Sequence, residues 1–218
     1  MQFIDDAEFQ INIDLDNGAR ISSLLWRDHQ ITLPYRGQPH THGWYALGPW
    51  AGRIRDGLIK DSSGNVFELP TNIDPPNALH GYGYTSSWQD IGQGRALLHL
   101  PAPYNGATLE QRIEVLDDAI RWSLEYDANG CDLPAWLGLH PWFARDIGAG
   151  NELELEFSAE QMLQRDKDGL PNGKLITPPK EPWDDAFTGI RGVPAVVWDG
   201  VLRIDIDSDA PWWVVYTE

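Results

Sequence analysis

The sequence has little cysteine, no long apolar run and few basic residues, and each shortage excludes something. A single cysteine, Cys131, stands among 218 residues, so an internal disulfide and a cysteine-based metal cage are both excluded. No segment approaches the roughly 20 consecutive apolar residues that a membrane-spanning helix needs. The residues after Met1 also lack the basic and apolar regions of a secretory signal. We therefore expect no membrane association and a cytoplasmic location.

The shortage of basic residues bears on binding partners. Lys and Arg number 16 against 33 Asp and Glu, which gives a formal net charge of −17 and a pI near 4.5. Binding to a phosphate backbone draws much of its free energy from basic side chains that release counterions. Nucleic acid and anionic membrane surfaces are therefore not expected as partners.

The recurring pattern is alternation of apolar and polar residues with a period of two, which is typical of strands with one wet face. It is clear in residues 9–15, 109–115, 120–126 and 153–157, whereas no convincing amphipathic helix is present. Residues 158–163 are open to two interpretations, a helical turn or another strand. The chain is sized for one domain, residues 1–218. We predict an all-β fold, a large antiparallel β-sandwich, because many strands must hide their edges and pair two apolar faces.

Glycine and proline, 21 and 16 in number, punctuate these strands. Pairs such as Asn17-Gly18 and Asn105-Gly106 suit turns that require a positive φ. Residues 36–57 are rich in Gly, Pro, His and Trp and show no clean periodicity. Such a stretch in a compact domain usually marks a functional loop.

The six histidines are the first candidates for chemistry, because the imidazole titrates near neutral pH. His29 and His99 lie in ordinary strand-like or turn-like surroundings and are interpreted as structural or surface residues. His40 and His42 form an H-x-H pair that would point the same way on a strand, as two metal ligands must. No carboxylate follows closely to complete such a site, so metal binding is kept only as an alternative.

Four other polar residues lie in loops rich in aromatic residues, glycine and proline. His80 follows a Pro-Pro turn and precedes a glycine, and His140 precedes Pro-Trp-Phe. Arg53 follows Gly-Pro-Trp-Ala-Gly, and Asp184 follows Pro-Trp. Each of them alone also suits a purely structural role. Together, in an all-β scaffold, they indicate a convergent carbohydrate site.

Four motifs in this order resemble those of the aldose 1-epimerases, or galactose mutarotases. They are Gly52-Arg53-Ile54, where the family usually reads N-R-I; His80-Gly81; Gly138 to Phe143, a G-x-H-P-W-F sequence; and Asp184 to Phe187, a D-x-x-F sequence. The similarity extends over nearly the whole chain. It implies a large antiparallel supersandwich with an open cleft for a sugar.

By this resemblance, His140 is the general acid that protonates the ring oxygen of a sugar, and Arg53, His80 and Asp184 bind its hydroxyl groups. Trp142 is expected to contact the substrate, and the indoles of Trp50, Trp142 and Trp183 are expected beside the site, since the flat face of an indole packs against sugar C–H groups. The resemblance requires no cofactor and no metal. The expected partner is a small sugar, bound by a monomer or a homodimer.

The resemblance is incomplete at three places, one of them Asp185, where many members of the family carry histidine. In the family the general base is a glutamate on a strand shortly beyond the segment that resembles Val214-Val215-Tyr216-Thr217, whereas this chain stops at Glu218. We therefore expect the base and the C-terminal strands of the fold to be missing, with Glu218 as the remaining candidate. Gly52 also replaces the asparagine of the N-R-I motif, which removes a side chain that would contact the substrate.

The main interpretation is an epimerase that interconverts the α and β anomers of a free hexose such as glucose or galactose. The alternative is a non-catalytic carbohydrate-binding sandwich, or a weakly active truncated epimerase. A hexose 6-phosphate is a less favoured substrate, because the acidic chain repels a dianion. A glycosidase built on Asp184 and Asp185 is disfavoured, because adjacent residues of a strand face opposite sides.

Overall fold

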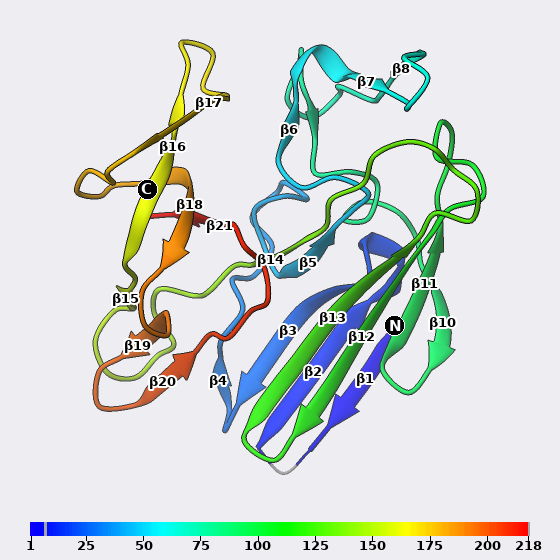
Figure 1. The fold of residues 1–218 in the computed structure, drawn as a ribbon. Helices are drawn as coiled ribbons and strands as arrows, with labels where there is room; N and C mark the ends of the chain where they lie inside the picture. The colour runs from blue at the N-terminus through cyan, green and yellow to red at the C-terminus, as the bar shows by residue number, and fades with distance from the viewer. Residues whose placement is uncertain (7, 218) are drawn as a thin grey trace. The chain divides into compact units, whose positions relative to one another are not determined.

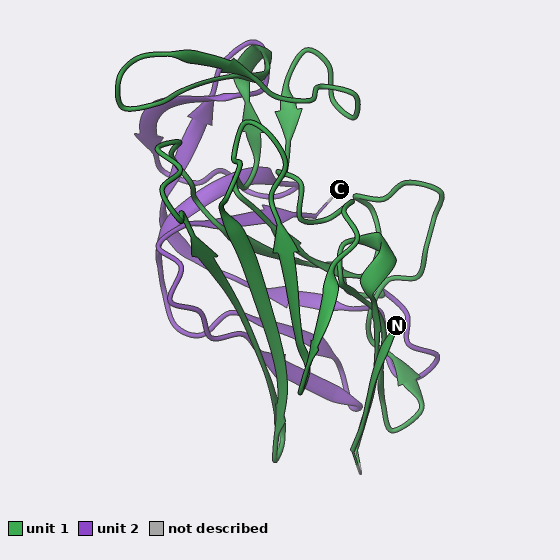
Figure 2. Ribbon diagram, turned by 90° about the vertical axis from the view of Figure 1, so that its right-hand side faces the viewer, with its two compact units in different colours: residues 1–144 green, residues 145–218 purple. Residues whose placement is uncertain are grey.

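The computed structural model describes residues 1–6 and 8–217, and within these its regular structure is almost entirely strand. The helical segments in that part of the chain are two short 3₁₀ turns, η1 (Leu15–Asn17) and η2 (Arg55–Gly57). The chain divides into two compact units, Met1–Ala144 and Arg145–Glu218 (Figure 2). The predicted all-β antiparallel sandwich is confirmed. The assignment of one domain to residues 1–218 stays a prediction.

Two antiparallel sheets form most of the first unit (Figure 1). One runs in the order β1-β2-β3-β5-β14, with β4 beside β3: β1 (Gln2–Asp5), β2 (Phe9–Asp14), β3 (Arg20–Trp26), β4 (His29–Gln30), β5 (Trp44–Leu47) and β14 (Gly138–Pro141). The other runs in chain order: β10 (Gln89–Gly92), β11 (Arg95–His99), β12 (Thr108–Leu116) and β13 (Ala119–Asp127). Two short ladders join β6 (Arg53–Ile54) to β9 (Ala78–Leu79) and β7 (Leu58–Lys60) to β8 (Val66–Glu68).

The two large sheets pack face to face through alternate side chains. Ile11 and Ile13 of β2 are fully buried, and burial of each side chain contributes about 1.5–3 kcal/mol. The rings of Trp44 and Trp122, from opposite sheets, stack at 6.2 Å. The buried amide of Gln111 donates a hydrogen bond to the carbonyl of Ala19, so the polar group inside the sandwich is satisfied.

The strands predicted from alternation are confirmed, and one prediction is corrected. Residues 9–15, 109–115, 120–126 and 153–157 lie mainly in β2, β12, β13 and β15 (Glu154–Glu156). Of residues 158–163, all but the first lie in a strand, β16 (Ala159–Arg165). Residues 36–57, interpreted as a loop, contain β5 and β6. All four residues of β5 are buried, so both faces are apolar and no alternation marks the strand.

The second unit contains two smaller antiparallel sheets. One has the order β15-β19-β20, with β19 (Ala195–Trp198) and β20 (Leu202–Asp205); the other has the order β17-β16-β18-β21, with β17 (Pro171–Ile176), β18 (Asp184–Ile190) and β21 (Trp213–Tyr216). Met162, Phe187 and Val215 form a buried cluster in this unit. No helix in the described parts of the chain is long and apolar enough to cross a membrane.

Candidate functional site

Pairing between distant segments of the first unit places two of the predicted histidines. β14 pairs with β5, which sets His140 opposite Tyr45. β9 pairs with β6, and His80 follows β9 directly. A bridge between Gly48 and Gly81 connects the end of β5 to the residue after His80. Three segments far apart in the sequence therefore meet around the two imidazoles.

The two imidazoles lie edge to face within an aromatic enclosure. The ring centroids of His80 and His140 are 5.5 Å apart at an interplanar angle of 86°. The ring of Trp142 stacks on His140 at 5.2 Å and 16°, and the fully buried ring of Tyr45 lies 4.8 Å from His140. Predicted residues His80, His140 and Trp142 are thus brought together.

Backbone hydrogen bonds fix the orientation and the tautomer of His80. The N–H of Gly52 donates to Nδ1 of His80 at 3.1 Å, and the N–H of His80 donates to the carbonyl of Gly52 at 2.9 Å. Because Nδ1 accepts a hydrogen bond, the neutral ring carries its proton on Nε2. That Nε2–H is the donor that His80 can offer to a ligand.

Both histidines are held neutral at physiological pH. Burial, reinforced by the nearby His140 and Arg53, lowers the pKa of His80 to about 3. Burial also lowers the pKa of His140 to about 4, with a further lowering by His40. The phenol of Tyr45 has a pKa raised by burial, so it stays protonated and donates to the carbonyl of His40 at 2.8 Å. The site thus presents neutral groups in a desolvated setting, which is typical of catalytic residues.

Arg53, predicted as a sugar ligand, lies beside these histidines and is ion-paired. Its Nε is 2.7 Å from Oδ2 of Asp74, and its side chain is 41% exposed. Its charge is close enough to lower the pKa of His80. Arg53 is therefore a solvent-facing cation at the histidine site, with its charge partly balanced by a carboxylate.

Asp184, the remaining predicted ligand, lies in the second unit as the first residue of β18. Nη1 of Arg165 lies 3.4 Å from Oδ2 of Asp184, and Nε of Arg165 lies 2.9 Å from Oδ1 of Asp185. One guanidinium thus pairs with both carboxylates, which does not favour the glycosidase alternative, where one of two carboxyls must hold a proton. The assignment of Asp184 to the sugar site stays a prediction.

His40 belongs to the surroundings of the site, a role that sequence reasoning missed. Its carbonyl accepts hydrogen bonds from Tyr45 Oη and, at 3.0 Å, from Nε1 of Trp142. Its proximity lowers the pKa values of His80 and His140. The H-x-H pattern did single out His40, but for metal binding. Tyr45 gave no signal of its own, because it lies in the uniformly buried β5.

His42 has a structural role. Its Nδ1 lies 3.0 Å from the carbonyl of Gln38, and its Nε2 lies 3.1 Å from Nη1 of the buried Arg20. The segment that contains His40 and His42 is made of turns and bends, so the strand geometry behind the metal alternative is absent there. Among residues 1–6 and 8–217, no group of three or more His, Cys, Asp or Glu side chains is arranged to hold a metal.

The indoles expected beside the site differ in their surroundings. Trp142 is partly buried and stacks on His140. Trp50 is fully buried and packs edge to face on Tyr82 at 5.3 Å, so its indole is not available to a ligand. Trp183 lies in the second unit and packs against Phe187. Glu218, the candidate base, lies outside the described residues.

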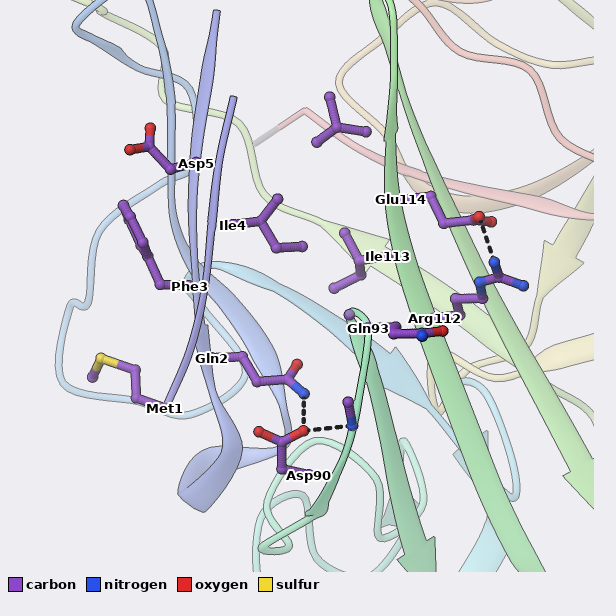
Figure 3. A pocket seen from close by; sticks show the side chains of 13 residues that line it. Met1, Gln2, Phe3, Ile4, Asp5, Asp90, Gln93, Arg112, Ile113 and Glu114 are labelled. Carbon is purple, nitrogen blue, oxygen red and sulfur yellow. Dashed lines mark hydrogen bonds and ion pairs between the residues drawn. The ribbon is translucent and has the colours of Figure 1, made fainter. Parts of the chain in front are cut away.

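A separate pocket of about 810 Å³ lies in the first unit, where β1 approaches β10 and β12 (Figure 3). The side chains of Ile4 and Ile113 point into it, and the amide of Gln2 donates a hydrogen bond to Asp90 at its rim (Figure 3). None of the predicted site residues is among its described lining residues. The pocket is an opening between the edges of the two sheets and is distinct from the histidine site.

Comparison with solved structures defines the class of fold. A putative aldose 1-epimerase from Escherichia coli K12 superposes with a TM-score of 0.73 at 17% identity, over 90% of this chain and 72% of that one. A galactose mutarotase-like protein from Clostridium acetobutylicum gives a TM-score of 0.70 at 16% identity, over 90% and 73%. A GalM/aldose epimerase homologue from C. elegans gives 0.69 at 17%, over 97% and 80%. The fold is the galactose mutarotase-like β-sandwich.

The family follows from the sequence itself. The family model for aldose 1-epimerase matches residues 4–189, which is most of the chain. This chain belongs to the aldose 1-epimerase family. No curated protein matches it in sequence.

Proposed function

We propose that this chain is an aldose 1-epimerase that interconverts the α and β anomers of a free hexose such as glucose or galactose. The observation that carries the proposal is the pair of neutral imidazoles, His80 and His140, held edge to face 5.5 Å apart in an aromatic enclosure. Opening a hemiacetal ring requires one proton delivered to the ring oxygen and one removed from the anomeric hydroxyl. Rotation about the C1–C2 bond and ring closure on the other face then give the second anomer.

In the proposed mechanism His140 delivers the proton to the ring oxygen. The resting imidazole is neutral, so it first takes a proton from solvent; because burial lowers its pKa to about 4, the imidazolium that forms gives this proton up readily. Loss of the anomeric proton to a base leaves a negative charge near the ring, and a nearby negative charge favours the protonated imidazole. Proton gain at the ring oxygen and proton loss at the anomeric hydroxyl therefore assist each other. On ring closure the same imidazole takes its proton back.

The other residues are proposed to hold the sugar. His80 donates from Nε2 to a hydroxyl, since Nδ1 is occupied by the N–H of Gly52. Arg53 offers guanidinium N–H groups to neighbouring hydroxyls, and Trp142 contributes an apolar ring face. Asp184 is proposed as a further hydroxyl ligand from the second unit.

An uncharged hexose suits this site better than a hexose 6-phosphate. The charge of Arg53 is already balanced by Asp74 at 2.7 Å, and the chain as a whole carries a formal charge of −17. A phosphate dianion needs uncompensated cations close to it. The electrostatics therefore favour glucose or galactose.

The test is mutarotation of freshly dissolved α-glucose and α-galactose, followed by polarimetry, for the wild-type chain and for His140→Ala. We expect His140→Ala to lower kcat/KM by about 10²–10⁴-fold, the usual contribution of one general acid. The matched control is His99→Gln, because His99 is an exposed histidine of β11. This control should retain wild-type kcat/KM.

Two results would contradict the proposal. If the wild-type chain does not accelerate mutarotation of either sugar above the rate in buffer alone, the proposed epimerase function is wrong. Full activity of His140→Ala, with His99→Gln as the reference, would remove His140 from the mechanism while leaving the reaction in place.

A further inference from the structure

The backbone of His40 is fixed against the two aromatic rings that pack on His140. Its carbonyl oxygen accepts hydrogen bonds from the hydroxyl of Tyr45 at 2.8 Å and from Nε1 of Trp142 at 3.0 Å. The ring of Tyr45 lies 4.8 Å from the ring of His140, and the ring of Trp142 stacks on it at 5.2 Å. Because the anchor is a backbone group, a substitution of the His40 side chain leaves this anchor in place.

The imidazole of His40 lies among the charged and titratable groups of the histidine site. Its proximity lowers the pKa values of His80 and His140. Burial is the main cause that lowers the pKa of His40 itself, and the charge of Arg53 adds to it, whereas the carboxylate of Asp74 opposes it. His40 is therefore neutral at physiological pH, and Asp74 is close enough to stabilise an imidazolium that forms there.

The Nδ1 atom of His40 is an unused hydrogen-bonding position. It is buried, and it has no hydrogen-bond partner among the residues that the structure describes. By contrast, Nδ1 of His80 already accepts from the N–H of Gly52. Because Nδ1 of His40 has no acceptor for a proton, the neutral ring keeps its proton on Nε2, and Nδ1 holds a free lone pair. A ligand hydroxyl that donates to Nδ1 satisfies this buried atom.

We propose that His40 is the general base of the reaction, and that its Nδ1 takes the proton of the anomeric hydroxyl while His140 protonates the ring oxygen. The inference rests on the proposed function, which requires a base for the anomeric proton. The electron pair of the O–H bond forms the second bond of the C1 carbonyl, and the pair of the broken C1–O5 bond goes to the ring oxygen, which binds the proton from His140. Ring closure reverses both transfers, so each imidazole returns to its starting form.

The experiment measures mutarotation of α-glucose by polarimetry for His40→Asn and His40→Ala. Asparagine can accept a hydrogen bond from a sugar hydroxyl, but it cannot take its proton. His40→Asn should therefore lower kcat by about 10²–10⁴-fold and leave KM nearly unchanged. In His40→Ala the space left by the ring admits free imidazole, which should raise kcat with a saturable dependence on its concentration, after subtraction of the rate that imidazole gives without protein.

Thr41→Ala is the matched control, because Thr41 is the next residue of the same loop and its hydroxyl donates to the carbonyl of Gln38 at 3.2 Å. It should keep the wild-type kcat, and free imidazole should not activate it. This control separates a disturbance of the loop from the loss of a proton acceptor.

The outcomes distinguish the base from the proposed function. An inactive wild-type chain would contradict the epimerase function itself. With an active wild-type chain, an unchanged kcat in His40→Asn would overturn the assignment of the base to His40 alone, and Asp74→Asn and Glu218→Gln would then locate the acceptor of the proton. Failure of imidazole to activate His40→Ala would also overturn this assignment.

Discussion

One arginine of the first unit and one of the second carry their charge in opposite surroundings. All six histidines lie in the first unit, where His80 and His140 are desolvated and Arg20 is 1% exposed. The guanidinium of Arg20 meets backbone carbonyls of Asn17, Pro39 and Tyr84 at 2.7–2.8 Å. In the second unit Arg203 pairs with Glu156 and Asp205 in solvent, with its side chain 46% exposed. Burial lowers the pKa of Arg20, whereas the hydrogen bonds to Glu156 and Asp205 raise the pKa of Arg203.

The glycines show the same contrast in packing. Gly81, beside His80, has a φ of +74°, and a Cβ on it would lie 2.1 Å from the carbonyl oxygen of Gly48. Gly192 of the second unit has a similar φ of +70°, but a Cβ there meets nothing within 4 Å. Glycine is required at position 81 both because the backbone at Gly48 is so close and because φ is positive. At position 192 only the positive φ favours glycine.

The largest expected effect tests this contrast directly. Gly81→Ala should destabilise the chain by more than about 4 kcal/mol, because the segment at Gly48 must move as well as the strained residue itself. Gly192→Ala should cost only about 1–2 kcal/mol, the penalty of a left-handed conformation. Urea unfolding followed by tryptophan fluorescence measures both. Equal losses for the two variants would show that backbone approach around His80 is looser than the structure indicates.

The next effect concerns the two guanidinium groups. Arg20→Met should destabilise the chain by about 3 kcal/mol, because it leaves several buried carbonyls without a donor. Arg203→Met should cost about 0.5 kcal/mol, the usual value of a solvent-exposed ion pair. The same unfolding measurement applies. A small effect at Arg20 would mean that water reaches its carbonyl partners.

Much of the fold could be predicted from the sequence because alternation reports strands with one buried face. β2, β12 and β13 were visible for that reason, whereas β5 was hidden because all its residues are buried. The turn residues were also predictable: Gly18 has the positive φ that Asn17-Gly18 predicts, and a Cβ built on it would lie 2.3 Å from the carbonyl oxygen of Tyr84. Local sequence patterns therefore predicted most strands, and the strand that has no alternating pattern was not predicted.

The site was predictable only in part, because its geometry depends on pairing between distant segments. The surroundings of His80 and His140 in the sequence singled them out, but their meeting depends on β14 pairing with β5 and β9 pairing with β6. His40 enters through its carbonyl, which a residue type does not reveal.

The smallest expected effect, counted per pH unit, is a pH dependence of the free energy of unfolding that arises from histidines of the first unit. In the unfolded chain a histidine has a pKa near 6.5, whereas burial lowers the pKa of His80 to about 3 and that of His140 to about 4. Between pH 4 and 6.5 the unfolded state binds more protons, so the stability present above pH 6.5 is lost as the pH falls. Each of the two histidines should contribute about 1 kcal/mol per pH unit in that window.

The measurement is the free energy of unfolding in urea at pH 7 and at pH 5.5. Carboxyl groups with ordinary pKa values near 4 stay largely ionised at both pH values, so the histidines dominate the difference. The double variant His80→Gln, His140→Gln should have a smaller pH dependence, with the remainder due to His40 and His42, whose pKa values burial also lowers. The variant His99→Gln, at an exposed histidine of the same unit, should keep the wild-type dependence. An unchanged slope in the double variant would mean that both imidazoles are solvated, and the neutral pair behind the proposed mechanism would no longer distinguish the first unit from the second.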